Sequence, residues 1–200
     1  MGDVATTDRM SAAEYLVWER EQRDKHEYHL GDVFLMAGGS PRHNYLASAI
    51  SGELRLVLRG SKRGVLSSDQ RVSAARDERY VYPDAVVVCG TFESEPGADD
   101  VLANPSMIVE VLSQSTERYD RGDKWEAYQQ LPSLTDYLLV SQRAKRVEHY
   151  QRGASGSWQY RQLGAGDEIV LSSGARLSID AVYRGAFDYP ADDQSTPRPD

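Results

Sequence analysis

The fold of this chain is decided by Pro83-Asp84-Ala85-Val86-Val87-Val88-Cys89 and by Met107-Ile108-Val109-Glu110-Val111-Leu112. Each segment is a short, almost wholly apolar run, which is typical of a strand buried inside a sheet. Each also carries one carboxylate, Asp84 at the entry of the first run and Glu110 near the exit of the second. A carboxylate is costly to bury in such a strand unless it is paired or bound to a cation.

The direction of the two strands decides whether these carboxylates meet. If the strands are antiparallel, Asp84 and Glu110 lie on neighbouring strands about 5 Å apart. If they are parallel, several residues at about 3.3 Å each separate the two side chains. Oxygen ligands alone suit Mg²⁺ or Mn²⁺, whereas zinc usually recruits histidine or cysteine. The antiparallel arrangement therefore predicts a site for a hard divalent cation, and the parallel one does not.

Patterns outside these strands predict an α+β domain in which helices flank a mixed β-sheet. A capping box at Ser11 begins a predicted helix over residues 11–24, and a tight hairpin is predicted over 28–36. We expect one domain over residues 10–190, with flexible tails at 1–9 and 191–200. Apolar periodicity predicts two further helices, at 43–58 and 116–131, and strands at 65–72, 80–82, 137–140, 147–150, 158–163 and 169–171.

Composition and charge exclude several classes of protein. The chain has 200 residues, with 23 Lys and Arg against 31 Asp and Glu, a net charge of −8 that disfavours coating of nucleic acid or of an anionic membrane. Its apolar runs fall short of the roughly 20 residues that span a bilayer, and from the polar residues at its start we expect no secretory signal. The single cysteine, Cys89, excludes an intrachain disulfide and is expected in the core. We expect a cytoplasmic protein without membrane contact, and any nucleic-acid site must be local.

Several motifs follow one another in a fixed order. Pro83-Asp84 is followed by Glu110-Val111-Leu112-Ser113, by Ser115-Thr116 and by Tyr119-Asp120-Arg121-Gly122-Asp123-Lys124. In this order they resemble the motifs of the Uma-two (Uma2) family of restriction endonucleases, within the PD-(D/E)XK nuclease superfamily. The segments 25–28, 38–44, 67–72 and 136–140 are similar too, so the resemblance spans about residues 10–187.

The resemblance implies a restriction-endonuclease-like core in which Asp84 and Glu110 hold Mg²⁺ or Mn²⁺, with the carbonyl of Val111 as a further ligand. The implied reaction is hydrolysis of a DNA phosphodiester bond. The superfamily pattern has a catalytic lysine two residues after the acid, where this chain has Leu112. Lys124, in the predicted helix that follows, is the expected substitute. A metal would polarise the phosphate and lower the pKa of bound water, while the ammonium would orient that water or stabilise charge on the phosphate.

Each of these candidates also has a structural alternative. Asp84 could be a turn residue after proline, and Glu110 could pair with an arginine at a sheet end. Lys124 stands four residues after Asp120, which is the favourable order for a surface ion pair. The motif order favours the metal-ligand role for Asp84 and Glu110, and leaves the two roles of Lys124 open.

Weaker candidates surround this set. The resemblance suggests that Glu27 and Asp69 are additional metal ligands or groups that orient water. Alternatively, Glu27 only stands at a helix-to-hairpin junction and Asp69 in a turn. His43 stands near the start of a predicted helix and is more often an exposed or capping residue than a base. Basic residues gather at the end of that helix, where they complement its dipole or contact DNA: Arg55, Arg59, Lys62 and Arg63.

Three functions are compatible with these residues. The leading hypothesis is a Mg²⁺-dependent DNA endonuclease, active as a homodimer because a duplex presents two strands. The second is a catalytically inactive nuclease-fold module that binds DNA or protein, favoured by the acidic charge and by Leu112. The third is a metal-dependent hydrolase of another phosphodiester, such as RNA. The sequence does not specify the nucleic-acid sequence, the pathway or whether the protein acts alone.

Overall fold

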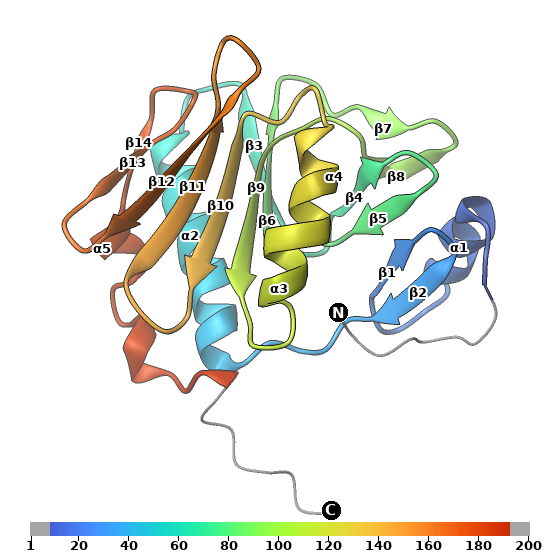
Figure 1. Cartoon of the computed structure of the whole chain (residues 1–200), viewed down its shortest axis with the longest axis horizontal. Helices are drawn as coiled ribbons and strands as arrows, with labels where there is room; N and C mark the ends of the chain where they lie inside the picture. The colour runs from blue at the N-terminus through green and yellow to red at the C-terminus, as the bar shows by residue number, and fades with distance from the viewer. Residues whose placement is uncertain (1–8, 193–200) are drawn as a thin grey trace, which may run out of the picture.

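The computed structural model describes residues 9–192 and has α+β architecture (Figure 1). Most of the two predicted tails, residues 1–8 and 193–200, lies outside the described residues. Ala191 and Asp192, at the predicted start of the second tail, contact the domain. Ala191 is buried, and the Asp192 carboxylate accepts a hydrogen bond from the backbone N–H of Ser40 at 3.2 Å.

A mixed six-stranded sheet carries both fold-deciding segments, in the order β12-β11-β10-β9-β6-β3. Strands β6 and β9 are antiparallel, with Ala85 opposite Val109, and β9 is parallel to β10. The antiparallel alternative is therefore confirmed. The strands are β3 (Arg63–Ser67), β6 (Ala85–Cys89), β9 (Pro105–Leu112), β10 (Asp136–Ser141), β11 (Arg146–Arg152) and β12 (Trp158–Gly164).

Helices cover both faces of this sheet (Figure 1). On one face, α2 (Pro41–Val57) packs with α5 (Ile179–Val182), β13 (Glu168–Val170) and β14 (Arg176–Ser178). The 3₁₀ turn Ala186–Asp188 packs beside them. On the other face lie α3 (Glu117–Tyr119), a π-helical turn over Asp120–Lys124 and α4 (Trp125–Gln129). Their apolar side chains, such as Tyr128, pack against Ile108 and Tyr137 of the sheet.

A second six-stranded sheet, in the order β2-β1-β5-β4-β8-β7, is covered by α1 (Ala12–Glu19). Tyr15 of α1 stacks on Tyr28 and Tyr80, with ring centres 5.0 and 5.7 Å apart. The predicted hairpin is present as β1 and β2. The strands are β1 (His26–His29), β2 (Asp32–Leu35), β4 (Arg71–Ala75), β5 (Arg79–Val81), β7 (Ser94–Glu95) and β8 (Ala98–Leu102).

Some predicted elements differ from the observed ones. The run 65–72 is not one strand, because a turn in which Gln70 N–H donates to the Ser67 carbonyl at 3.0 Å sends its two halves into different sheets. The first helix ends at Glu19, and the helix over 116–131 contains the π turn. The prediction that Cys89 lies in the core was wrong, because β6 ends there, opposite Arg63 of the edge strand β3, and Cys89 is exposed. Within residues 9–192, no helix is long and apolar enough to cross a membrane.

Candidate active site

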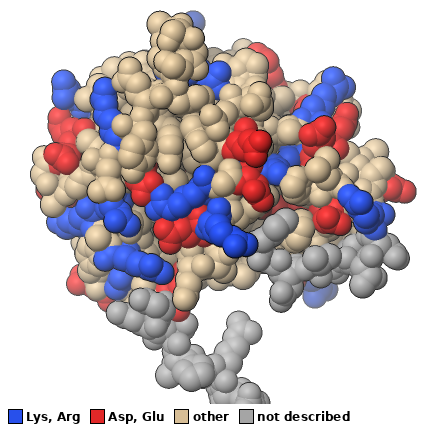
Figure 2. Space-filling view, viewed as in Figure 1, with Lys and Arg blue, Asp and Glu red and all other residues tan. Residues whose placement is uncertain are grey.

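A cleft of about 710 Å³ is lined by elements of both sheets. One wall consists of the β1–β2 hairpin and the loop before it. The other walls consist of the start of α2, the end of β9 and the segment formed by α3 and the π turn. Asp84, Glu110 and Lys124 all line it. On the face that carries α3 and α4, acidic and basic side chains are interspersed (Figure 2).

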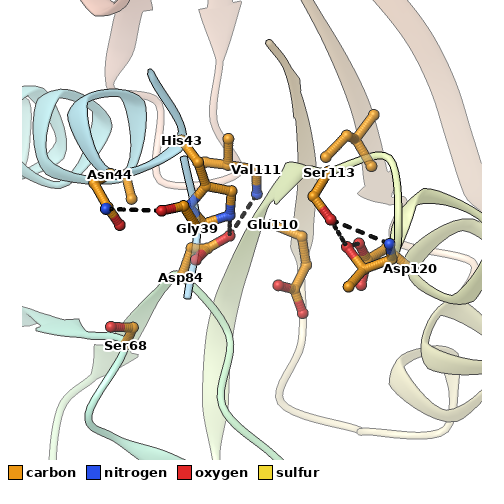
Figure 3. A network of polar contacts seen from close by, with 12 residues as sticks. Gly39, His43, Asn44, Ser68, Asp84, Glu110, Val111, Ser113 and Asp120 are labelled. Atoms are coloured by element: carbon orange, nitrogen blue, oxygen red, sulfur yellow. Dashed lines mark hydrogen bonds and ion pairs between the residues drawn. The ribbon is translucent and has the colours of Figure 1, made fainter. Parts of the chain in front are cut away.

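Asp84 is fixed at the entry of β6 by two hydrogen-bond donors (Figure 3). Its Oδ2 accepts the backbone N–H of Val111 at 2.7 Å and lies 3.3 Å from His43 Nε2. In a β-strand the N–H and the carbonyl of one residue point to the same side, so the Val111 carbonyl also faces the side of Asp84. Asp84 directly precedes Ala85, which pairs with Val109. Its carboxylate is thus bound to the neighbouring strand β9 next to that pair.

Glu110 points from β9 into the cleft and is 4% exposed. Its Oε1 accepts a hydrogen bond from the Tyr128 hydroxyl at 2.9 Å and lies 3.2 Å from Lys124 Nζ. The charged partner of Glu110 is therefore a lysine and not the arginine of the structural alternative. Burial raises the pKa of Glu110 well above its usual value, since the opposing effect of Lys124 is offset by the charges of Asp120, Asp84 and Glu27.

Lys124 is buried among three carboxylates. Its Nζ lies 2.9 Å from Glu27, 3.2 Å from Glu110 and 3.3 Å from Asp120. Burial alone would lower the pKa of Lys124, but the charges of Glu110, Glu27 and Asp120 raise it well above its usual value. The ammonium is held in its charged form, in direct contact with the acid of β9.

Hydrogen bonds in the connection between β9 and α3 position Lys124 beside Glu110. Ser113 Oγ accepts the N–H of Thr116 at 3.1 Å, and Thr116 Oγ1 donates to Asp120 Oδ2 at 2.7 Å (Figure 3). Asp120, Lys124 and Tyr128 then follow at four-residue spacing, which keeps them on nearly one face of the helical segment. All three are buried, and the Asp120–Lys124 ion pair faces the cleft and not solvent. A π turn, a feature frequent at functional sites, carries Lys124.

The weaker candidates separate in the structure. Glu27 belongs to the cleft, where its Oε1 accepts the Tyr82 N–H at 3.2 Å and meets Lys124. Asp69 lies on the turn between β3 and β4, where its exposed side chain pairs with Lys25 at 2.6 Å. The structure does not bring Asp69 to the other carboxylates. The basic group at the end of α2 does not line the cleft either, and Arg55 donates to the Val65 carbonyl at 3.0 Å.

His43 is a site residue to which the sequence gave little weight. Ser40 caps α2 and accepts the His43 N–H at 3.2 Å, which places the imidazole in the first turn, against Asp84. Burial opposes protonation, but the hydrogen bond and charge of Asp84 outweigh it and raise the pKa of His43. The sequence signalled the helix start, but not that its first turn faces β6.

The oxygen donors of the cleft suit a Mg²⁺ ion held by a few protein ligands better than an ion enclosed entirely by protein side chains. Within residues 9–192, no group of three or more His, Cys, Asp or Glu side chains is arranged to hold a metal alone. Mg²⁺, however, usually keeps several waters and is bound through one or two carboxylates together with substrate phosphates. Asp84, Glu110 and the Val111 carbonyl match that requirement. Six carboxylates line the cleft against two lysines and one arginine, so its excess negative charge favours a cation: Asp24, Glu27, Asp84, Glu110, Asp120 and Asp192.

The chain is similar to known proteins in sequence and in fold. The model of the Uma2 family, described as "Putative restriction endonuclease", matches residues 12–181. Two proteins of Synechocystis sp., both named as uncharacterized, are 35% identical over 178 residues (88% of this chain and 93% of the relative) and 36% identical over 170 residues (84% and 96%). The crystal structure of a "putative nuclease belonging to DUF820" from Anabaena variabilis shares the fold with a TM-score of 0.72, at 14% identity, covering 88% of this chain and 99% of that one.

Proposed function

The chain belongs to the Uma2 family, and from that premise we propose that it is a Mg²⁺-dependent endonuclease that hydrolyses DNA phosphodiester bonds. One observation carries the proposal: the Lys124 ammonium lies 3.2 Å from Glu110, in a cleft that also holds Asp84. Leu112, at the position of the superfamily's catalytic lysine, is packed in the core and carries no charge. Lys124 supplies the positive charge in its place. The substrate is expected at a local site, in keeping with the net charge of −8.

Each residue of the cleft has a distinct role in this proposal. When bound, the metal supplies charge that polarises the phosphate and lowers the pKa of a water molecule. Asp84 and Glu110 bind it, and the hydrogen bonds from Val111 and His43 hold the Asp84 carboxylate in one orientation. Lys124 orients the attacking water or stabilises the charge that develops on the phosphate. Glu27 and Asp120 hold the Lys124 ammonium in place.

The test is nicking of supercoiled plasmid DNA by the purified protein with Mg²⁺ or Mn²⁺, and with EDTA as control. Cleavage that depends on the metal supports an endonuclease, and an RNA of matched sequence identifies the polymer. Binding of DNA without cleavage of either polymer would favour the inactive nuclease-fold module instead. The presence of Leu112 where the superfamily has a lysine also favours that module. We propose a homodimer as the active form, to be measured by sedimentation of the full chain.

We expect Glu110→Gln to stabilise the metal-free protein while abolishing cleavage. Folding raises the pKa of Glu110, so the cost to stability is absent below the unfolded-state pKa near 4.5, grows as the pH rises above that value and is complete once the pH passes the folded-state pKa. The neutral amide should therefore gain on the order of 1 kcal/mol at pH 8, and the gain should shrink as the pH falls. Urea unfolding in EDTA measures it, with the exposed Glu168→Gln as control. A loss of stability at pH 8 would contradict this electrostatic account.

We expect His43→Ala to weaken both Mn²⁺ binding and cleavage by about 10- to 100-fold, because residues that orient a metal ligand contribute on that scale. His43→Gln, whose Nε2 can still donate to Asp84, should keep most of both. Gly39→Ala tests the position of the ring without removing it. An added Cβ at Gly39 would lie 2.5 Å from His43 Nδ1, whereas at Gly38 it would meet nothing within 4 Å. Equal behaviour of Gly39→Ala and its control Gly38→Ala would exclude this role.

A further inference from the structure

One face of the β1–β2 hairpin forms a wall of the cleft and carries apolar side chains. In the hairpin register Glu27 lies opposite Phe34, and cross-strand partners project from the same face. Glu27 reaches Lys124 at 2.9 Å, so Phe34 also projects toward the cleft that it lines. Met36, the residue that follows β2, donates its backbone N–H to the Lys25 carbonyl at 2.9 Å and lines the cleft too.

Beside Glu27, this wall carries the apolar side chains of Phe34 and Met36, in a cleft that also holds many charged residues. Phe34 and Met36 are only partly buried, so each keeps a surface available to a ligand. Arg23, which is exposed, and Lys25 line the same side of the cleft, on the loop between α1 and β1. An aromatic and apolar surface with cations beside it matches a nucleotide, whose base is flat and apolar and whose phosphate is negative.

The size of the cleft limits how much nucleic acid can enter. Its volume of about 710 Å³ lies within the range of roughly 300–1,000 Å³ that holds drug-sized ligands, so it admits one or two nucleotides and not a stretch of duplex. In a duplex both faces of each base are covered by neighbouring bases. Only a base that has left the stack can therefore cover Phe34.

We propose that Phe34, assisted by Met36, is a base-stacking subsite beside Lys124, and that the preferred substrate is single-stranded or locally unpaired DNA. This inference rests on the proposed function and adds the substrate class to it. Arg23 contacts the phosphate that flanks the stacked base, because the Lys25 ammonium beside it is already paired with Asp69 at 2.6 Å. A duplex lying across the mouth of the cleft, with only its scissile phosphate inside, is the competing arrangement.

The test compares Phe34→Ala and Phe34→Trp with the full-length parent. Phe92→Ala is the matched control, because Phe92 is an exposed phenylalanine between β6 and β7 that does not line the cleft. Each protein is given a single-stranded oligonucleotide, its matched duplex and a duplex with a single-stranded gap, with Mn²⁺. Far-ultraviolet circular dichroism and thermal melting establish that each variant is folded.

We expect the parent to cleave the single-stranded and gapped substrates at least about 10-fold faster than the matched duplex. Phe34→Ala should slow their cleavage by about 5- to 150-fold, which is the effect of losing one base–aromatic contact. Phe34→Trp should keep the preference, and Phe92→Ala should match the parent. Equal cleavage of single strand and duplex by the parent, or equal behaviour of Phe34→Ala and Phe92→Ala, would overturn the proposal.

A binding measurement separates failure of the subsite from failure of the proposed hydrolysis. The single strand carries a fluorescent base analogue, and its affinity is measured with Ca²⁺ in place of Mn²⁺. If no substrate is cleaved but the parent binds the strand and Phe34→Ala binds it at least 5-fold more weakly, the subsite stands and the nuclease activity does not. If the plasmid is nicked but Phe34→Ala binds and cleaves like the parent, only the subsite is refuted.

Discussion

Replacing Lys124 with methionine should slow Mn²⁺-dependent DNA cleavage by about 100-fold or more and lower the free energy of unfolding by about 3–5 kcal/mol. The loss of rate follows because the variant has no ammonium to orient water or to stabilise charge on the phosphate. The loss of stability follows because Glu27, Glu110 and Asp120 would remain buried without their shared cation. Affinity for Mn²⁺ should not fall, since Lys124 is not a ligand.

The pH dependence of this stability has a definite sign. The pKa of Lys124 is raised by folding, so its contribution is fully present below the unfolded-state pKa near 10.5 and is lost only as the pH rises toward the folded-state value. The part of the destabilisation that comes from losing the Lys124 charge should therefore be present in full at both pH 7 and pH 9. Urea unfolding at both values measures it, with Lys145→Met as control, because Lys145 forms an exposed pair with Asp180. Unchanged cleavage by Lys124→Met would mean that the positive charge comes from elsewhere.

Replacing Asp84 with asparagine should abolish metal-dependent cleavage, a loss of about 1,000-fold or more, because the amide lacks the charge that binds the cation. The metal-free protein should not be destabilised. The asparagine Oδ1 can still accept the Val111 N–H, and removal of one charge relieves repulsion from Glu110. Plasmid nicking and thermal melting in EDTA measure the two effects, and the exposed Asp180→Asn serves as control. A variant that cleaves like the parent would make Asp84 a turn residue only.

Local pattern predicted the strands and the helix face at the centre of this site, whereas the roles of Asp84, Glu110 and Lys124 were taken from the resemblance to the Uma2 family. The apolar runs around Asp84 and Glu110 predicted adjacent buried strands, and the four-residue spacing of Asp120, Lys124 and Tyr128 predicted a common face. The structure confirms the antiparallel pairing of the strands, and of the two alternatives left open for the common face it shows the one in which the face points toward the cleft. These predictions worked because strand burial and helix periodicity depend on neighbours close in sequence.

The rest of the site depends on contacts between distant segments. Glu27 and Asp69 looked alike in the sequence, but only Glu27 enters the cleft, because β1 pairs with β5 and turns one face of the hairpin toward Lys124. His43 meets Asp84 because the first turn of α2 packs against the entry of β6, which no local pattern encodes. The strand predicted over residues 65–72 is divided between two sheets for the same reason. The residues on both sides of the turn favour β-structure, so the local pattern does not mark the change of sheet.

Anomalous diffraction from crystals of the full chain soaked in Mn²⁺ measures whether Asp84 and Glu110 share one divalent cation in this cleft, as we claim. We expect a single anomalous peak at about 2.0–2.6 Å from an oxygen of each carboxylate, with Lys124 remaining beside it. Absence of a peak between the two side chains in crystals that bind Mn²⁺ elsewhere, or carboxylates too far apart to share an ion, would contradict the claim.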